Sequence, residues 1–206
     1  MSTGKLYIIS APSGAGKTSL VRRLIAEVEN LVVSISHTTR PIRPGETDGK
    51  DYFFVSQAEF QVLLDSHELL EHASVFDNYY GTAKATVEQN LTDGLDVILE
   101  IDWQGAQQIK AIRPDSLSIF ILPPSTGILE QRLQDRGQDD DAVIARRMRD
   151  AVTEMSHYKE FDYILVNDVF ERALTELKSI IIANRLTKDR QQRNLKKMIE
   201  ALLSSS

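Results

Sequence analysis

One short run of the sequence combines residue types that bind phosphate. Residues 11–18, "APSGAGKT", hold two glycines, a lysine and a threonine between the apolar run "KLYIIS" and a helical pattern over 19–30. Glycine permits the positive φ that turns consecutive backbone N–H groups toward an anion. The helix that follows directs its positive dipole end at the same place. The run therefore predicts a polyphosphate site.

The spacing matches the P-loop pattern G-x-x-x-x-G-K-[ST] except at its first position, where Ala11 replaces glycine. An alanine fits there if its φ is ordinary. We expect Lys17 to reach the β- and γ-phosphates of a nucleoside triphosphate and the Thr18 hydroxyl to coordinate Mg²⁺. A glycine-rich turn with a solvated lysine is the alternative, and the strand–loop–helix order disfavours it. The expected ATP-binding residues in this loop are Ala11, Pro12, Ser13, Gly14, Ala15, Gly16, Lys17 and Thr18.

A second group of candidate phosphate ligands lies in "SISHTTRPIRPGETDGKDYFF", residues 34–54. Arg40 and Arg43 are three residues apart and are each followed by a proline, so two guanidinium groups are available to grip one phosphate bidentately. The Tyr52 hydroxyl is placed to complete the shell. Taken alone, the arginines also fit surface charges on a turn.

Two further segments supply polar side chains. "ELLEHASVFDNYYGT" contains Glu71, Tyr80 and Thr82, and "ILEIDWQG" contains Glu100 and Asp102 at the end of an apolar strand. Each has a structural alternative: Glu71 as a solvated carboxylate, Tyr80 as packing, Asp102 as the cap of the helix that follows. The occurrence of these residues together, in this order and after a nucleotide-binding loop, favours a binding site for a second substrate.

The composition excludes several classes of function. The chain has 206 residues, a net charge of −6 and no cysteine, so it has neither disulfides nor thiolate metal sites. Its acidity disfavours general nucleic-acid binding. The four histidines show no metal-ligand spacing, and no apolar run is long enough for a signal peptide or a membrane span. We expect a cytoplasmic protein.

Strand and helix patterns alternate along much of the chain, which predicts an α/β fold with a parallel central sheet. The expected strands cover 5–10, 31–36, 51–55, 95–102, 116–124 and 161–168, and the expected helices cover 19–30, 56–66, 85–94, 126–137, 139–158 and two C-terminal segments. Ser56 and Glu59 form the pattern of a capping box. The rhythm breaks at 36–84 and at 126–159, which we interpret as insertions.

The motifs "SxTTRxxRxGExxGxxYxF", "NYYGT" and "DxQG", in this order after the P-loop, resemble the guanylate kinase family. The resemblance extends from the P-loop to "VND" near residue 168. It implies a three-layer P-loop NTPase fold with a small mixed acceptor-binding insertion and a helical lid. The core would be 1–35, 85–125 and 160–206, the GMP-binding insertion 36–84 and the lid 126–159.

The resemblance also implies roles for individual residues. The guanine contacts would be Ser36, Glu71, Thr82 and Asp102. The contacts to the GMP phosphate would be Arg40, Arg43, Tyr52 and Tyr80. The lid arginines would be Arg136 and Arg147, and Asn167 would lie near the adenine ring of ATP. The catalytic set would be Lys17, Arg40, Arg43, Arg136 and Arg147. The chemistry agrees, because guanine presents N1–H and its 2-amino group as donors, and a carboxylate only accepts.

The expected function is ATP:GMP phosphotransfer, giving GDP and ADP by in-line, Mg²⁺-assisted transfer in guanine nucleotide metabolism. The expected partners are ATP and GMP, with no nucleic acid and no membrane. Two alternatives stay open: a non-catalytic guanylate-kinase-like module that binds phosphopeptides, and a kinase for another small phosphorylated acceptor. The amphipathic "NLKKMIEALL" is compatible with packing on the chain's own core or in a homo-oligomer.

Overall fold

The computed structural model describes residues 3–75, 77–135 and 141–204. Its central sheet has five parallel strands in the order β2-β7-β1-β8-β9. The bounds are β1 Leu6–Ser10, β2 Leu31–Val33, β7 Asp96–Glu100, β8 Leu117–Leu122 and β9 Tyr163–Val166. The predicted parallel α/β fold is confirmed.

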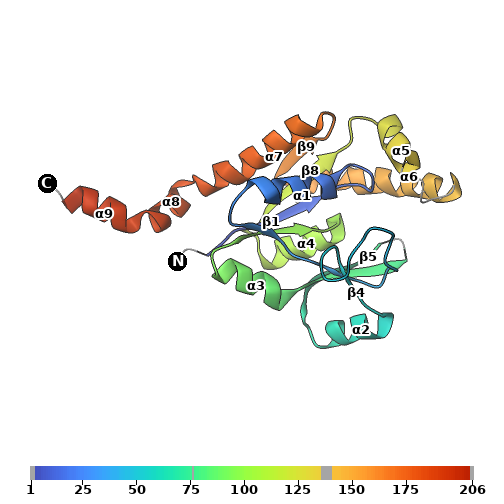
Figure 1. Ribbon diagram of the computed structural model, residues 1–206, viewed down its shortest axis with the longest axis horizontal. Coiled ribbons are helices and arrows are strands. Elements are labelled where there is room, and N and C mark those ends of the chain that lie inside the picture. The colour runs from blue at the N-terminus through green and yellow to red at the C-terminus, as the bar shows by residue number, and fades with distance from the viewer. Residues whose placement is uncertain (1–2, 76, 136–140, 205–206) are drawn as a thin grey trace.

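Helices cover both faces of this sheet (Figure 1). Tyr7 and Ile9 of β1 pack with α1 (Lys17–Glu27) and α7 (Phe170–Arg185), whereas Leu6 and Ile8 face α3 (Lys84–Thr92) and α4 (Trp103–Ile112). Successive strand residues point to opposite faces, so a strand covered on both sides is apolar throughout. This burial explains why "KLYIIS" is recognisable as a strand.

The insertion folds around a second, mixed sheet in the order β4-β3-β6-β5. Its strands are β3 His37–Thr38, β4 Phe53–Phe54, β5 Leu69–Val75 and β6 Asn78–Ala83, and α2 (Gln57–Asp65) packs below them in Figure 1. The capping box predicted at Ser56 and Glu59 is present. The β5–β6 hairpin is not among the predicted elements. Its strands are half-buried with interspersed polar residues, a weaker signal than a buried apolar run.

The segment predicted to be the lid, 126–159, contains α5 (Thr126–Asp135) and α6 (Asp141–Ser156), followed by a 3₁₀ turn over His157–Glu160. The two helices pack through Leu129, Leu133 and Ile144. Arg136, one of the predicted catalytic residues, lies outside the described residues.

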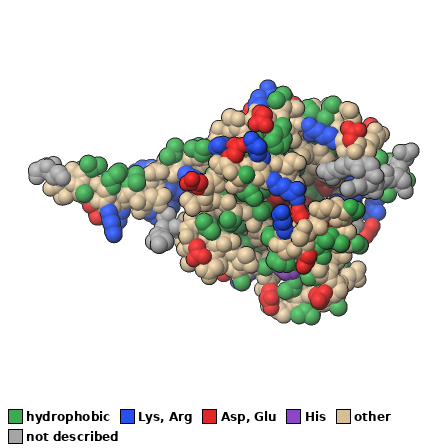
Figure 2. All heavy atoms as spheres, in the orientation of Figure 1, with side chains coloured by type: hydrophobic (Ala, Val, Ile, Leu, Met, Phe, Trp, Pro, Cys, Tyr) green, Lys and Arg blue, Asp and Glu red, His purple; other side chains and the backbone are tan. Residues whose placement is uncertain are grey.

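The C-terminal part forms three helices rather than the two predicted, namely α7, α8 (Lys188–Asn194) and α9 (Lys196–Ser204). Helices α8 and α9 extend away from the body as an arm (Figures 1 and 2). Arg185 and Arg190 attach the base of the arm to Asp96, which is 1% exposed, through contacts of 2.8 Å each. Among the helices of the described ranges, none has the length and apolar character needed to span a membrane.

Candidate active site

The loop between β1 and α1 has the backbone that the P-loop motif requires. Gly14 and Gly16 both adopt φ of 92°, and Gly16 is the N-cap of α1. A side chain at Gly16 would also place its Cβ 2.4 Å from Asn167 Nδ2. Ala11 is not among the residues with positive φ, so its substitution for glycine costs the loop no strain.

Two side chains support this loop from behind. Asn167, 4% exposed, donates from Nδ2 to the carbonyl oxygen of Ala15 at 2.7 Å. Arg132 of α5 donates to the carbonyl oxygen of Asn167 at 3.0 Å. Neither Asn167 nor the fully buried Ala15 lines the cavity in front of the loop. The predicted place of Asn167 beside adenine stays a prediction.

A cavity of about 240 Å³ opens in front of the loop. It brings together the P-loop, the segment around the second sheet, and α6. The predicted site residues on its wall are Ala11, Pro12, Ser13, Gly14, Gly16, Lys17, Thr18, Ser36, Arg43, Tyr52, Glu71, Tyr80, Asp102 and Arg147. Segments far apart in the sequence thus form one site.

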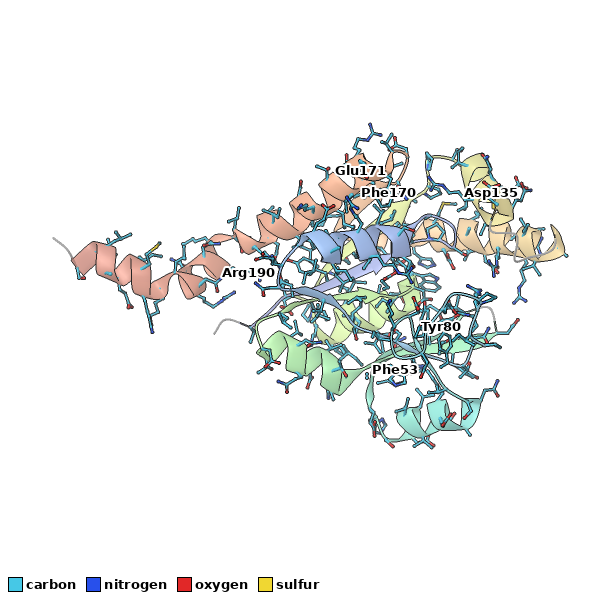
Figure 3. The ribbon with its side chains drawn as sticks, viewed as in Figure 1. Phe53, Tyr80, Asp135, Phe170, Glu171 and Arg190 are labelled. Atoms are coloured by element: carbon cyan, nitrogen blue, oxygen red, sulfur yellow. The ribbon has the colours of Figure 1, made fainter. Side chains whose placement is uncertain are left out.

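A second cavity of about 830 Å³ adjoins the first and shares Arg43, Tyr52 and Tyr80 with it. Arg40 lines only this second cavity. In Figure 3, Tyr80 lies where the insertion faces the core, whereas Arg190 lies on the other side of the body, at the base of the arm. Figure 2 shows basic side chains gathered in the middle of this face, with carboxylates beside them.

A chain of buried polar groups forms the inner wall. The hydroxyls of Ser36 and Thr82 lie 3.3 Å apart, and Thr82 donates to Glu71 Oε1 at 2.6 Å. Glu71 is 3% exposed. Burial, aided by the charge of Asp102 and opposed by the Thr82 hydrogen bond, raises the pKa of Glu71 to about 7. Thr82 lies behind Glu71 and is not among the residues on the cavity wall.

The glycine of the "DxQG" motif has a packing reason. A Cβ on Gly105 would lie 2.4 Å from Glu71 Oε2, so any larger residue would displace the carboxylate. Asp102 accepts a hydrogen bond from the Gly105 backbone N–H at 3.0 Å and is the N-cap of α4. The alternative considered for Asp102, a helix cap, is thus confirmed, and Asp102 also lines the cavity.

Arg40 is held by an acidic partner that the sequence reasoning did not single out. Its guanidinium binds both carboxylate oxygens of Glu46, at 2.8 and 3.0 Å, and Glu46 also accepts from the backbone N–H of Arg43. Burial lowers the pKa of Arg40, but the ion pair with Glu46 outweighs it and the pKa is raised. The Arg40 side chain is only 9% exposed. Glu46 therefore orients the Arg40 side chain and also holds the backbone at Arg43.

The polar atoms near the P-loop residues Lys17 and Thr18 are oxygens of the kind that bind metal ions. Thr18 donates from its hydroxyl to Glu100 Oε2 at 3.2 Å, and Lys17 Nζ lies 3.4 Å from the carbonyl oxygen of Ile101. Hydroxyl and carboxylate oxygens are the donors that Mg²⁺ prefers. Burial and the charge of Glu100 raise the pKa of Tyr52 to about 12, so its hydroxyl remains a hydrogen-bond donor at neutral pH.

This site matches a known family over most of the chain. The guanylate kinase family model matches residues 3–184. The chain belongs to the guanylate kinase family. Guanylate kinase from Methylococcus capsulatus is 58% identical over 203 residues, covering 98% of this chain and 100% of the relative. Guanylate kinase from Hahella chejuensis is 56% identical over 205 residues, covering 100% and 99%.

A solved structure gives the same assignment. The crystal structure of guanylate kinase from Anaplasma phagocytophilum has a TM-score of 0.76 and 35% identity, and the match covers 92% of this chain and 90% of that chain. Membership of the guanylate kinase family makes this chain a nucleotide-binding kinase, a transferase.

Several residues of the site were not in the predicted set, and three of them have an evident role. Glu154 lines the cavity from α6, Glu46 binds Arg40, and Gly105 leaves room for Glu71. One signal was available for Glu154, because it lies seven residues after Arg147 and so on the same helix face. Glu46 and Gly105 are part of the motifs "SxTTRxxRxGExxGxxYxF" and "DxQG", but their contacts with Arg40 and Glu71 come only from the tertiary structure.

Proposed function

We propose that this protein transfers the γ-phosphoryl group of ATP to the phosphate of GMP. The observation that carries the proposal is that one cavity holds the P-loop lysine Lys17 and the buried carboxylate Glu71, with Arg43 and Tyr80 on the wall they share. A triphosphate site and a guanine-matched site on one cavity suit transfer between two nucleotides.

The acceptor site suits guanine for a reason of hydrogen bonding. Ionised Glu71 accepts from N1–H and from the 2-amino group, while the Ser36 hydroxyl donates to O6 and Thr82 holds the carboxylate from behind. Adenine would leave these buried groups unpaired, and such a site discriminates by about 10⁴. Asp102, on the same wall, completes the guanine-binding set.

The reaction needs positioning more than acid–base chemistry. A GMP phosphate oxygen attacks the γ-phosphorus, the bond from that phosphorus to the β–γ bridging oxygen breaks, and ADP leaves with the electron pair. Arg40, Arg43, Tyr52 and Tyr80 hold the acceptor phosphate in line and offset the repulsion between two anions. Lys17 and Arg147, together with Arg136, stabilise the charge on the moving group.

A Mg²⁺ ion bound to the Thr18 hydroxyl and to phosphate oxygens would neutralise charge on the triphosphate. The core (1–35, 85–125 and 160–206) binds ATP in this proposal, 36–84 binds GMP, and 126–159 is the lid. Because water competes as a nucleophile, the insertion and the lid must exclude it before the arginines engage. The pathway that uses the product is guanine nucleotide metabolism, in the cytoplasm.

The test is ADP production from Mg·ATP with GMP, AMP, CMP and UMP offered separately. We expect turnover with GMP alone and slow ATP hydrolysis without it. Turnover with none of the four while ATP still binds would mean another phosphorylated acceptor. If ATP does not bind either, the non-catalytic phosphopeptide module becomes the better explanation; the intact Lys17 and Thr18 argue against it.

A further inference from the structure

Glu154 of α6 faces the P-loop. A carboxylate in this position would repel the phosphates of a bound substrate. It lines the same cavity as Lys17, and the backbone N–H of Ser13 hydrogen-bonds to its carboxylate. The Oε2 atom is buried and has no hydrogen-bond partner of its own within the described part of the chain by distance and angle. A buried acceptor without a donor is costly, so this atom calls for a functional explanation.

The charges around Glu154 come from three elements. Lys17 of α1 attracts it, whereas Asp102 before α4 and Asp150 of α6 repel it. Arg147, two turns earlier on α6, lines the same cavity. Burial is the largest influence, and against the opposing charge of Lys17 it raises the pKa of Glu154 to about 7. The carboxyl group is thus partly ionised at neutral pH in the empty protein.

We propose that Glu154 takes up a proton from solvent when a nucleoside triphosphate binds, and so makes the lid helix sensitive to the charge in the P-loop. The proposal rests on the proposed function only in requiring that the loop bind such a nucleotide. An ionised carboxylate only accepts hydrogen bonds and repels phosphate oxygens. A protonated one no longer repels them and adds an O–H donor to the carboxyl group.

The direct test measures protons. Binding of the Mg²⁺ complex of a non-hydrolysable ATP analogue is followed calorimetrically at pH 7.5 in two buffers of different ionisation enthalpy. We expect the wild-type protein to take up between about half and three-quarters of a proton per nucleotide, because a group with a pKa near 7 is about three-quarters ionised at pH 7.5 before binding. Glu154→Gln should reduce the uptake to near zero.

Affinity provides a second readout. The amide of Glu154→Gln carries no charge at any pH, so this variant should bind the analogue about three- to tenfold more tightly than wild type at pH 8. At pH 6, where Glu154 is already protonated, the two should bind alike. Titration of the nucleotide itself is common to both proteins and cancels in the comparison.

Glu130→Gln is the matched control, since Glu130 is an exposed carboxylate of the other lid helix, α5, and does not line the cavity. It removes the same charge from the lid and should leave proton uptake and affinity at wild-type values. Equal uptake in wild type and Glu154→Gln, or binding without uptake in wild type, would overturn the proposal while leaving the nucleotide site in place. Failure of wild type to bind the analogue would overturn the proposed function as well. The wild-type uptake alone decides the matter if Glu154→Gln does not fold.

Discussion

Thr82 donates a hydrogen bond of 2.6 Å to Glu71, and neither side chain is more than 3% exposed. Thr82 binds Oε1 from behind, while Gly105 places no side chain beside Oε2, where a Cβ would lie 2.4 Å from that oxygen. The carboxylate is thereby fixed in orientation at the wall of the cavity. A fixed, desolvated acceptor can distinguish between bases, because a mismatched base gains nothing to replace the water it loses.

Glu71→Gln should remove the discrimination between guanine and other bases. The amide presents an NH₂ group where guanine also presents donors, so kcat/KM for GMP should fall by about 100-fold or more. The KM for ATP should stay unchanged, and the preference for GMP over AMP should shrink by the same factor. Steady-state kinetics with both acceptors measures this. An unchanged preference would show that Glu71 does not contact the base.

The affinity for GMP should depend on pH through Glu71. Its pKa is raised to about 7, so the group that accepts from guanine is mostly protonated at pH 6 and mostly ionised at pH 8. The KM for GMP at saturating ATP should therefore fall by roughly tenfold between these two values. The ratio of this KM between wild type and Glu71→Gln isolates the effect from titration of the GMP phosphate. If the ratio of the wild-type KM to the Glu71→Gln KM rose with pH, Glu71 would not be the group that accepts hydrogen bonds from guanine.

The same shift affects stability. The folded-state pKa of Glu71 lies above its unfolded value of 4.5, so the unfolded chain binds fewer protons over this interval. The contribution of protonated Glu71 to the free energy of unfolding is complete below pH 4.5 and is lost as the pH rises through about 7. Urea unfolding should show a free energy of unfolding that decreases from pH 5 to pH 8 more in wild type than in Glu71→Gln. An equal decrease in both would refute the shift.

Gly105→Ala should damage the acceptor site selectively. The new Cβ would meet Glu71 Oε2 at 2.4 Å and displace the carboxylate, so the KM for GMP should rise by about tenfold or more while that for ATP stays constant. Gly127→Ala is the matched control, because it is also a helical glycine and its Cβ would meet no atom closer than 4.0 Å. Similar kinetics for the two alanine variants would argue against the steric explanation.

Glu46→Gln should weaken GMP binding without touching the P-loop. Arg40 would lose its ionic partner and the orientation that Glu46 imposes, and the KM for GMP should rise several-fold, corresponding to about 1 kcal/mol. Asp115→Asn breaks the exposed contact of Lys5 at the other end of the sheet and should change nothing measurable. A KM for GMP that remains at the wild-type value would mean that Arg40 does not hold the acceptor phosphate.

Lys17→Met should fold normally and lose nearly all transfer, because methionine keeps the volume of the lysine stem but not its charge. Circular dichroism and thermal unfolding test the first half and GDP formation the second. Turnover at the wild-type level would show that the nucleotide site has been placed wrongly.

Several features could be predicted from the sequence because their causes are local. The P-loop requires glycine at particular φ angles, as Gly14 and Gly16 show, and "KLYIIS" is apolar because both faces of β1 are covered. The capping box at Ser56 involves only residues three apart. The β5–β6 hairpin was not predicted, because its strands are not continuously buried.

The sequence by itself therefore determined the nucleotide loop, the order of the parallel strands along the chain and the set of polar residues available to an acceptor. Only the tertiary structure decided what those residues can do. Ser36 and Thr82 meet although 46 positions separate them, α4 brings Gly105 against Glu71, and α6 brings Glu154 to the cavity. The burial and the pKa of a carboxylate are set by its neighbours in space, and a sequence pattern contains only its neighbours along the chain.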